Sequence, residues 1–150
     1  MRFAHTNIAA KSWRALADFY IRVFECSIKP PQRNLSGDWL DRATGLKNAC
    51  LEGVHLILPG YGANAPTLEI FTYTDMHTRE PLMANYTGFT HIAFEVEDVD
   101  AIFKRALSLG AEELGRPIEK VIGNVGVLKF VYLRDPEGNI IEIQSWKHEE

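Results

Sequence analysis

The stretch Phe89-Thr90-His91-Ile92-Ala93-Phe94 repeats the pattern of Phe3-Ala4-His5-Thr6-Asn7-Ile8, and this repetition decides the fold. His5 and His91 occupy the same place in the two copies, at an offset of 86 residues. The same offset separates Ser12 from Asp98, and both residue types accept hydrogen bonds from the free N–H groups of a first helical turn. Self-similarity at a fixed offset is the signature of an internal repeat. The sequence therefore predicts two copies of one structural module.

A helix is expected after each of these capping residues. Apolar residues recur there at helical spacing, as one buried helix face requires: Trp13, Leu16, Tyr20, Val23 and Phe24 in the first copy, and Val99, Ile102, Phe103 and Ala106 in the second. Gly110 lies where the second helix is expected to stop in a left-handed backbone conformation.

Strand-like segments follow each helix and are separated by turn-rich sequence. We expect strands over 48–58 and 67–72 in the first copy, and over 127–134 and 140–146 in the second. Clusters of Gly, Pro, Asp and Asn at 59–62 and 135–139 indicate antiparallel hairpins. Glu69 and Glu142 end the two copies alike at an offset of 73 residues, so the first copy contains 13 extra residues. We place these around 33–46, as a loop with a short helical turn at 37–42.

The expected organisation is one domain over 1–150, built of module 1 (about 1–72), a linker (about 73–88) and module 2 (about 89–146). A chain of 150 residues suits a single domain. Its formal net charge of −4, without a basic run, argues against nucleic-acid binding. No apolar stretch approaches the roughly 20 residues of a membrane helix, and the first residues lack the apolar core of a signal peptide. We therefore expect a cytoplasmic protein with neither nucleic-acid nor membrane partners.

The repeated His and Glu residues share one face of their strands. Strand side chains alternate between two faces, so the apolar neighbours of His5, Glu69, His91 and Glu142 point to the opposite side. If the modules pair about a pseudo-twofold axis, these two imidazoles and two carboxylates line one shared concavity. Such a set suits a borderline divalent ion, Zn, Ni, Co, Mn or Fe, and disfavours calcium, which prefers oxygen ligands.

Four segments carry a family resemblance: Phe3-Ala4-His5, Pro66-Thr67-Leu68-Glu69-Ile70-Phe71, Gly88-Phe89-Thr90-His91-Ile92-Ala93-Phe94 and Tyr132-Leu133-Arg134-Asp135-Pro136-Glu137-Gly138-Asn139-Ile140-Ile141-Glu142-Ile143. Through them the chain resembles the vicinal oxygen chelate (VOC) superfamily, which includes glyoxalase I, methylmalonyl-CoA epimerase, extradiol dioxygenases, and fosfomycin- and bleomycin-resistance proteins. The resemblance implies an α+β fold of two tandem βαβββ modules that form a curved, incompletely closed mixed β-sheet around a metal site. It also implies one divalent metal per site, held by His5, Glu69, His91 and Glu142, and a homodimer.

From this site we expect a metal-dependent isomerase or lyase of the glyoxalase or methylmalonyl-CoA epimerase type, acting on a small-molecule substrate. A carboxylate beside a chelated carbonyl can remove the adjacent proton and return it elsewhere. Glu142 is our first choice for this base, and Glu69 is the symmetry-related candidate for returning the proton. Four further residues are candidates for substrate contact: Asn7, Trp39, Phe71 and Gln144. The sequence contains no recognisable glutathione-binding or coenzyme A-binding set.

Two alternative functions stay open at the level of the sequence. A non-haem iron dioxygenase needs two His and one carboxylate with free positions for oxygen, and Glu69 as a fourth ligand counts against it. A non-catalytic binder of drug-like molecules would not be expected to keep all four ligand positions.

Several other polar residues are given no functional role. His55 and His77 have no counterpart in the repeat, and His148 lies in the charged tail. Cys26 and Cys50 are expected to behave as small buried apolar residues, since nothing near them in the sequence suggests activation.

Overall fold

The computed structural model describes residues 1–148, which form two compact units. Unit 1 covers Met1–Arg79 and unit 2 begins at Glu80. The boundary lies inside the segment 73–88 that the sequence predicts as a linker, so each predicted module corresponds to one unit. That the two modules form a single domain stays a prediction.

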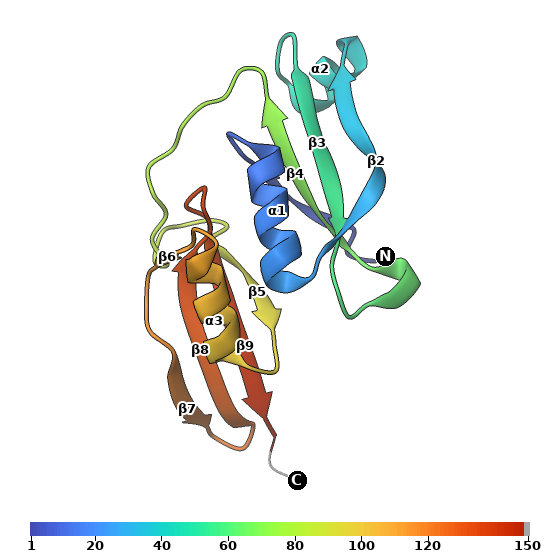
Figure 1. The fold of residues 1–150 in the computed structure, drawn as a ribbon. Helices are drawn as coiled ribbons and strands as arrows, with labels where there is room; N and C mark the ends of the chain where they lie inside the picture. The colour runs from blue at the N-terminus through green and yellow to red at the C-terminus, as the bar shows by residue number, and fades with distance from the viewer. Residues whose placement is uncertain (149–150) are drawn as a thin grey trace. The chain divides into compact units, whose positions relative to one another are not determined.

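Unit 1 is a four-stranded mixed sheet with a helix on one face (Figure 1). The strand order is β1-β4-β3-β2, in which β1 and β4 are parallel and the other neighbours are antiparallel. Its elements along the chain are β1 (His5–Ala9), α1 (Trp13–Phe24), β2 (Ser27–Ser36), α2 (Asp38–Thr44), β3 (Cys50–Ile57), a 3-10 turn (Gly62–Asn64) and β4 (Thr67–Tyr73).

Unit 2 repeats this plan. Its five-stranded sheet has the order β5-β9-β8-β6, with β7 also paired to β8; β5 and β9 are parallel and the remaining pairs are antiparallel. Its elements are β5 (His91–Glu95), α3 (Val99–Ser108), β6 (Glu112–Glu113), β7 (Ile118–Ile122), β8 (Gly126–Arg134) and β9 (Ile140–Lys147). In each unit the first and last strands are therefore parallel neighbours.

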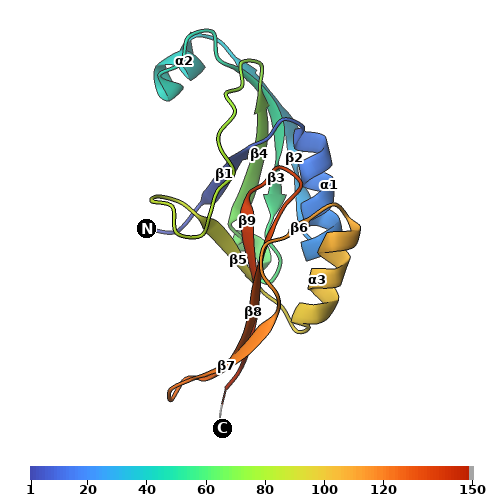
Figure 2. The ribbon, with the colours of Figure 1, turned by 90° about the vertical axis from the view of Figure 1, so that its left-hand side faces the viewer.

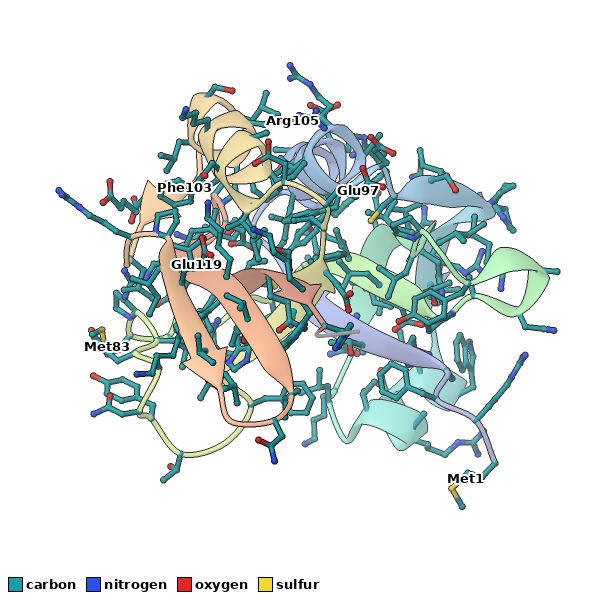
Figure 3. The ribbon with its side chains drawn as sticks, turned by 90° about the horizontal axis from the view of Figure 1, so that it is seen from below. Met1, Met83, Glu97, Phe103, Arg105 and Glu119 are labelled. Atoms are coloured by element: carbon teal, nitrogen blue, oxygen red, sulfur yellow. The ribbon has the colours of Figure 1, made fainter. Side chains whose placement is uncertain are left out.

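Each helix begins where its cap was predicted and buries its apolar face. The Ser12 side chain accepts from the Ala15 N–H, and the Asp98 carboxylate accepts from the Ala101 N–H at 3.0 Å. Helix α1 packs on β3 and β4, and α3 packs on β8 and β9, as Figures 1 and 2 show. Phe103, which is buried, lies between α3 and the strands in Figure 3. One sheet face in each unit is thereby covered, and the opposite face carries the polar residues of interest.

Strand β2 is the main difference from the sequence-based expectation, which placed a loop over part of this segment. It is an edge strand whose pairing with β3 shifts register between Lys29 and Arg33, around Pro30 and Pro31. Proline has no N–H for a sheet ladder and is confined to edges and bulges. The two prolines therefore make this segment look unlike a strand in the sequence. The loop prediction was wrong for residues 33–36, whereas the helical turn expected at 37–42 is confirmed by α2.

The α+β class, with two modules built on mixed sheets, is confirmed. Within residues 1–148, no helix is long and apolar enough to cross a membrane.

Candidate metal and proton-transfer site

The parallel pairing of β1 with β4 brings His5 and Glu69 together in unit 1. Asn7 is in register with Glu69, and His5 lies two residues earlier on the same face. His5 Nε2 lies 3.5 Å from Glu69 Oε2, and Asn7 Nδ2 donates to the same oxygen at 3.4 Å. Only 12% of the Glu69 side chain is exposed, against 47% for His5. The predicted His–Glu pair of module 1 is therefore formed within this unit.

His55, to which the sequence assigned no role, contacts the other oxygen of the same carboxylate. It faces Glu69 across the β3–β4 register, with Nε2 at 3.1 Å from Oε1. Its second ring nitrogen, Nδ1, lies 3.3 Å from the Thr67 hydroxyl. Burial lowers the pKa of His55 against the raising effect of the Glu69 charge, and the cations Arg33 and Lys29 lower it further.

Unit 2 forms the corresponding pair, because β5 and β9 are also parallel neighbours. His91 Nε2 lies 3.1 Å from Glu142 Oε2, and only 13% of the Glu142 side chain is exposed. The other ring nitrogen of His91, Nδ1, lies 3.1 Å from the Thr90 hydroxyl. A second partner of this kind orients an imidazole so that Nε2 can serve a metal.

Tyr132 completes the group in unit 2. It faces Glu142 across the β8–β9 register, and its ring centroid lies 5.0 Å from that of His91. Burial raises the pKa of Tyr132, and the negative charge of Glu142 and a hydrogen bond to that carboxylate raise it further. The phenol therefore stays neutral at physiological pH and can donate its O–H to Glu142.

The residues predicted for substrate contact lie in different surroundings. Asn7 belongs to the Glu69 group, as described above. Phe71 is buried, with its ring 5.8 Å from that of His55. Gln144 is half-buried on β9, in register with Phe130, whereas Trp39 lies on α2 with 52% of its surface exposed. Substrate binding by these four residues stays a prediction.

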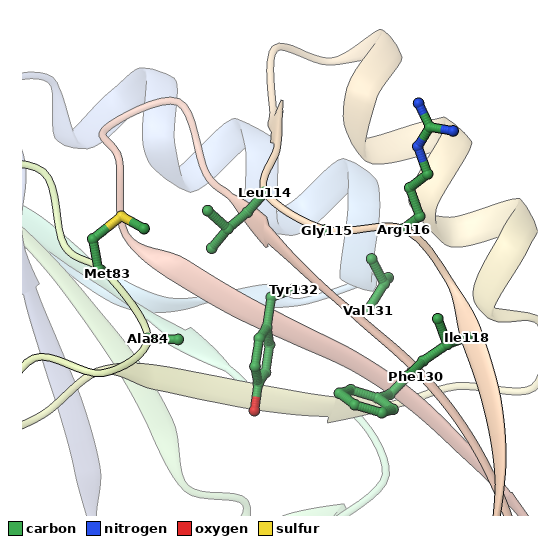
Figure 4. Close-up of a pocket in the computed structure, with 9 residues that line it drawn as sticks. All are labelled: Met83, Ala84, Leu114, Gly115, Arg116, Ile118, Phe130, Val131 and Tyr132. Atoms are coloured by element: carbon green, nitrogen blue, oxygen red, sulfur yellow. The ribbon is translucent and has the colours of Figure 1, made fainter.

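A pocket of about 320 Å³ opens beside Tyr132 in unit 2 (Figure 4). Met83, Leu114, Ile118 and Phe130 contribute mostly apolar walls, and Tyr132 forms another. Its volume lies at the lower end of the range of small-molecule sites. Tyr132 therefore lines this pocket and also contacts His91 and Glu142.

The donor set fits the metal that the sequence predicts, although each unit holds only part of it. Imidazole nitrogens and carboxylate oxygens are the ligands that borderline divalent ions prefer. Within residues 1–148, no three His, Cys, Asp or Glu side chains form a group that could hold an ion. Each unit supplies one His–Glu pair, so the predicted four-ligand site needs both pairs.

Sequence reasoning found the two pairs but missed the strand-to-strand partner of each carboxylate. The sequence contains a hint of these partners, because each lies on the strand before the carboxylate in a hairpin. His55 precedes Glu69 by 14 residues and Tyr132 precedes Glu142 by 10, since the turn-rich segments between them differ in length. Because the spacings differ, comparison at a fixed offset leaves His55 without a counterpart. In the register of the sheets, its counterpart is Tyr132.

Comparison with protein-family models matches residues 5–143 to the family described as glyoxalase-like domain. Among curated proteins, the metallothiol transferase FosB of Shouchella clausii (strain KSM-K16) is 38% identical over 61 residues. That match covers 39% of this chain and 39% of the relative, so the chain spans about two fifths of the length of that curated relative.

Solved structures share the fold over nearly the whole chain. A glyoxalase family protein from Bacillus cereus has a TM-score of 0.78 at 21% identity, with 97% of this chain and 93% of that chain covered. A variant of the fosfomycin resistance protein FosX from Listeria monocytogenes, in complex with Mn(II) and 1S,2S-dihydroxypropylphosphonic acid, has a TM-score of 0.56 at 15% identity, with 95% and 90% covered.

Proposed function

Because the chain belongs to the glyoxalase-like domain family of the VOC superfamily, we propose that it is a metal-dependent enzyme that moves a proton next to a carbonyl of a small substrate. The observation that carries this proposal is the His–Glu pair on neighbouring parallel strands in both units, His5–Glu69 and His91–Glu142. Two imidazoles and two carboxylates on equivalent strands are what a shared divalent site of this family would require.

In this proposal the four side chains would hold one divalent ion, Zn, Ni, Co, Mn or Fe. The ion would polarise adjacent substrate oxygens and stabilise the negative charge that develops when the neighbouring proton is lost. Glu142 accepts that proton, and the Tyr132 hydroxyl orients the accepting carboxylate by donating to it. Glu69 takes up a proton from water, while Glu142 releases the one it accepted, and delivers it either to a neighbouring atom, as in an isomerisation, or to the opposite face of the same carbon, as in an epimerisation.

The apolar lining of the pocket beside Tyr132 favours a substrate that carries a small apolar group. Its walls offer burial to such a group and few polar partners. We therefore expect 2-oxo hemithioacetals and acyl thioesters with short apolar substituents to be the first compounds to test.

Elemental mass spectrometry of the protein tests the metal, as isolated and after removal and reloading. We expect about one divalent ion per site, lost when His5 and Glu142 are both changed to Ala. Proton exchange from D₂O into a candidate substrate then tests the reaction, and exchange should be lost in Glu142→Gln with the metal retained. Absence of stoichiometric metal under every loading condition would refute the catalytic proposal.

A thiol transfer is the second candidate function, because the curated relative with 38% identity over 61 residues is a metallothiol transferase. In that case the site would bind an electrophile such as the epoxide of fosfomycin. The thiol sulfur would form a bond to an epoxide carbon as the C–O bond breaks, and the thiol proton would end on the released oxygen. Incubation of the metal-loaded protein with fosfomycin and a panel of low-molecular-weight thiols, followed by mass spectrometry of the products, separates the two reactions. A thiol adduct without proton exchange would favour the transferase.

The other expectations from the sequence stay proposals. Tightly held iron in the elemental measurement would favour the dioxygenase alternative, and a tight ligand without turnover would favour a drug-binding protein. Equilibrium sedimentation tests the expected homodimer, and fractionation of the source cells tests the cytoplasmic location.

A further inference from the structure

The Glu69 carboxylate is contacted differently on its two oxygens. Oε1 lies 3.1 Å from His55 Nε2. Oε2 lies 3.5 Å from His5 Nε2 and 3.4 Å from the donating Asn7 amide. The predicted metal ligand His5 is therefore on the Oε2 side, and His55 lies on the side away from it.

Three side chains besides Glu69 contact the His55 ring. Thr67, which is 5% exposed, lies at 3.3 Å from Nδ1. The rings of Phe71 and His5 make edge contacts with it, at centroid distances of 5.8 Å and 6.3 Å. Only 17% of the His55 side chain is exposed, so this ring has little freedom to leave Glu69.

The direction of the hydrogen bonds follows from the partners. Glu69 Oε1, as part of an ionised carboxylate, can only accept, so His55 Nε2 must carry the proton. In the neutral ring Nδ1 then accepts from the Thr67 hydroxyl. This assigns a relay of donors from Thr67 through His55 to Oε1, so that His55 does not occupy Oε2, the oxygen on the side of His5.

The same arrangement occurs in unit 2 with a different donor. Tyr132 faces Glu142 across the hairpin as His55 faces Glu69, and it is hydrogen-bonded to that carboxylate. Two units with different loops and different residues thus supply a neutral donor to the carboxylate at the same point of the sheet. Because both modules place a hydrogen-bond donor at this position, the donor is better explained by a need to orient the carboxylate than by local packing.

We propose that His55 is a positioning residue for metal binding: it holds Glu69 by Oε1 so that Oε2 is presented, beside His5, to the ion. This inference rests on the proposed metal site. His55 acts through Glu69, in the way that donors behind metal ligands orient them and raise metal affinity. The same part in unit 2 is taken by Tyr132.

Titration of the metal-free protein with Co(II), followed by the visible absorption of the bound ion, tests this role. We expect His55→Leu to bind Co(II) about 10- to 100-fold more weakly, because removing a residue that hydrogen-bonds to a metal ligand typically lowers metal affinity by this factor. At saturation its spectrum should match that of the wild type, since the ligands are unchanged. His55→Gln keeps an N–H donor and should recover most of the affinity.

His77→Leu is the matched control, because His77 is an exposed histidine of the same unit and should leave Co(II) affinity unchanged. Circular dichroism and thermal unfolding of the metal-free variants establish that each is folded. A folded His55→Leu with wild-type affinity would overturn the proposal, as would a changed Co(II) spectrum at saturation, which would make His55 a ligand. Failure of the wild type itself to bind Co(II) would instead refute the metal site, and the two failures are thereby distinguished.

Discussion

Gly53 shows how closely the residues around the candidate site are packed. A Cβ at this position would lie 2.1 Å from the Ile70 carbonyl oxygen and 2.4 Å from the Phe71 ring. The absence of a side chain lets Phe71 lie over β3 and reach the His55 ring. Glycine in a strand often marks such a close approach of a neighbour.

Gly53→Ala is therefore expected to destabilise the protein strongly. The clash is with backbone as well as with the ring, so we expect a loss of about 2 kcal/mol or more in the free energy of unfolding. For a chain of this size that lowers the Tm by at least about 4 °C. Gly115→Ala is the control, because its Cβ would meet only the Tyr132 carbonyl oxygen, at 3.8 Å. Equal melting temperatures for the two variants would contradict this account.

Cys26 is a buried free thiol, as the sequence suggested, and burial raises its pKa from 9.0 to about 12. Because the folded pKa lies above the unfolded value, the contribution to stability is complete below about pH 9. It is lost as the pH rises toward 12, with a slope of at most about 1.4 kcal/mol per pH unit. Urea unfolding at pH 8, 9 and 10 should show a steeper loss of stability for the wild type than for Cys26→Ala. Parallel pH profiles for the two proteins would argue against a raised pKa of Cys26 in the folded state.

At the scale of elements, the helix caps were readable from the sequence because they act within one turn. Asp98 accepts from the Ala101 N–H at 3.0 Å and places a negative charge at the positive end of α3. Asp98→Ala should cost about 1 kcal/mol in urea unfolding. Ser12→Ala, at the equivalent position of α1, should cost less, because its bond to the Ala15 N–H is longer, at 3.4 Å. A larger effect at Ser12 would reverse this ranking.

The turn between β8 and β9 is likewise stabilised by hydrogen bonds among its own residues. Asp135, which is 1% exposed, accepts from the N–H groups of Glu137 and Asn139 and from the Asn139 amide. Its carboxylate therefore stabilises the hairpin turn that the sequence predicts at 135–139. Lys129, on the neighbouring strand β8, pairs with Asp100 of α3.

At the scale of the whole molecule, the four proposed ligands are divided equally between the two units, so metal binding tests whether one ion uses both His–Glu pairs. If one ion uses both His–Glu pairs, a divalent ion at 100 times its Kd stabilises the protein by about 2.7 kcal/mol. This corresponds to a rise in Tm of about 5–10 °C. Differential scanning calorimetry with and without Zn(II) should show the rise in the wild type, and neither His5→Ala nor His91→Ala should show it. Survival of the full shift in either variant would mean that one unit is sufficient.

The sequence by itself determined the repeat, the helix starts and the strands that carry His5, Glu69, His91 and Glu142. These features depend on residue periodicity and on capping over a few residues, which are local properties of the chain. Only the tertiary structure decided that β2 is a strand, because an edge strand is defined by the neighbour that pairs with it, and Pro30 and Pro31 hide it. It also decided the partners of the two carboxylates. His55 and Tyr132 reach Glu69 and Glu142 through hairpin registers set by loops of unequal length, and no fixed offset along the chain encodes that pairing.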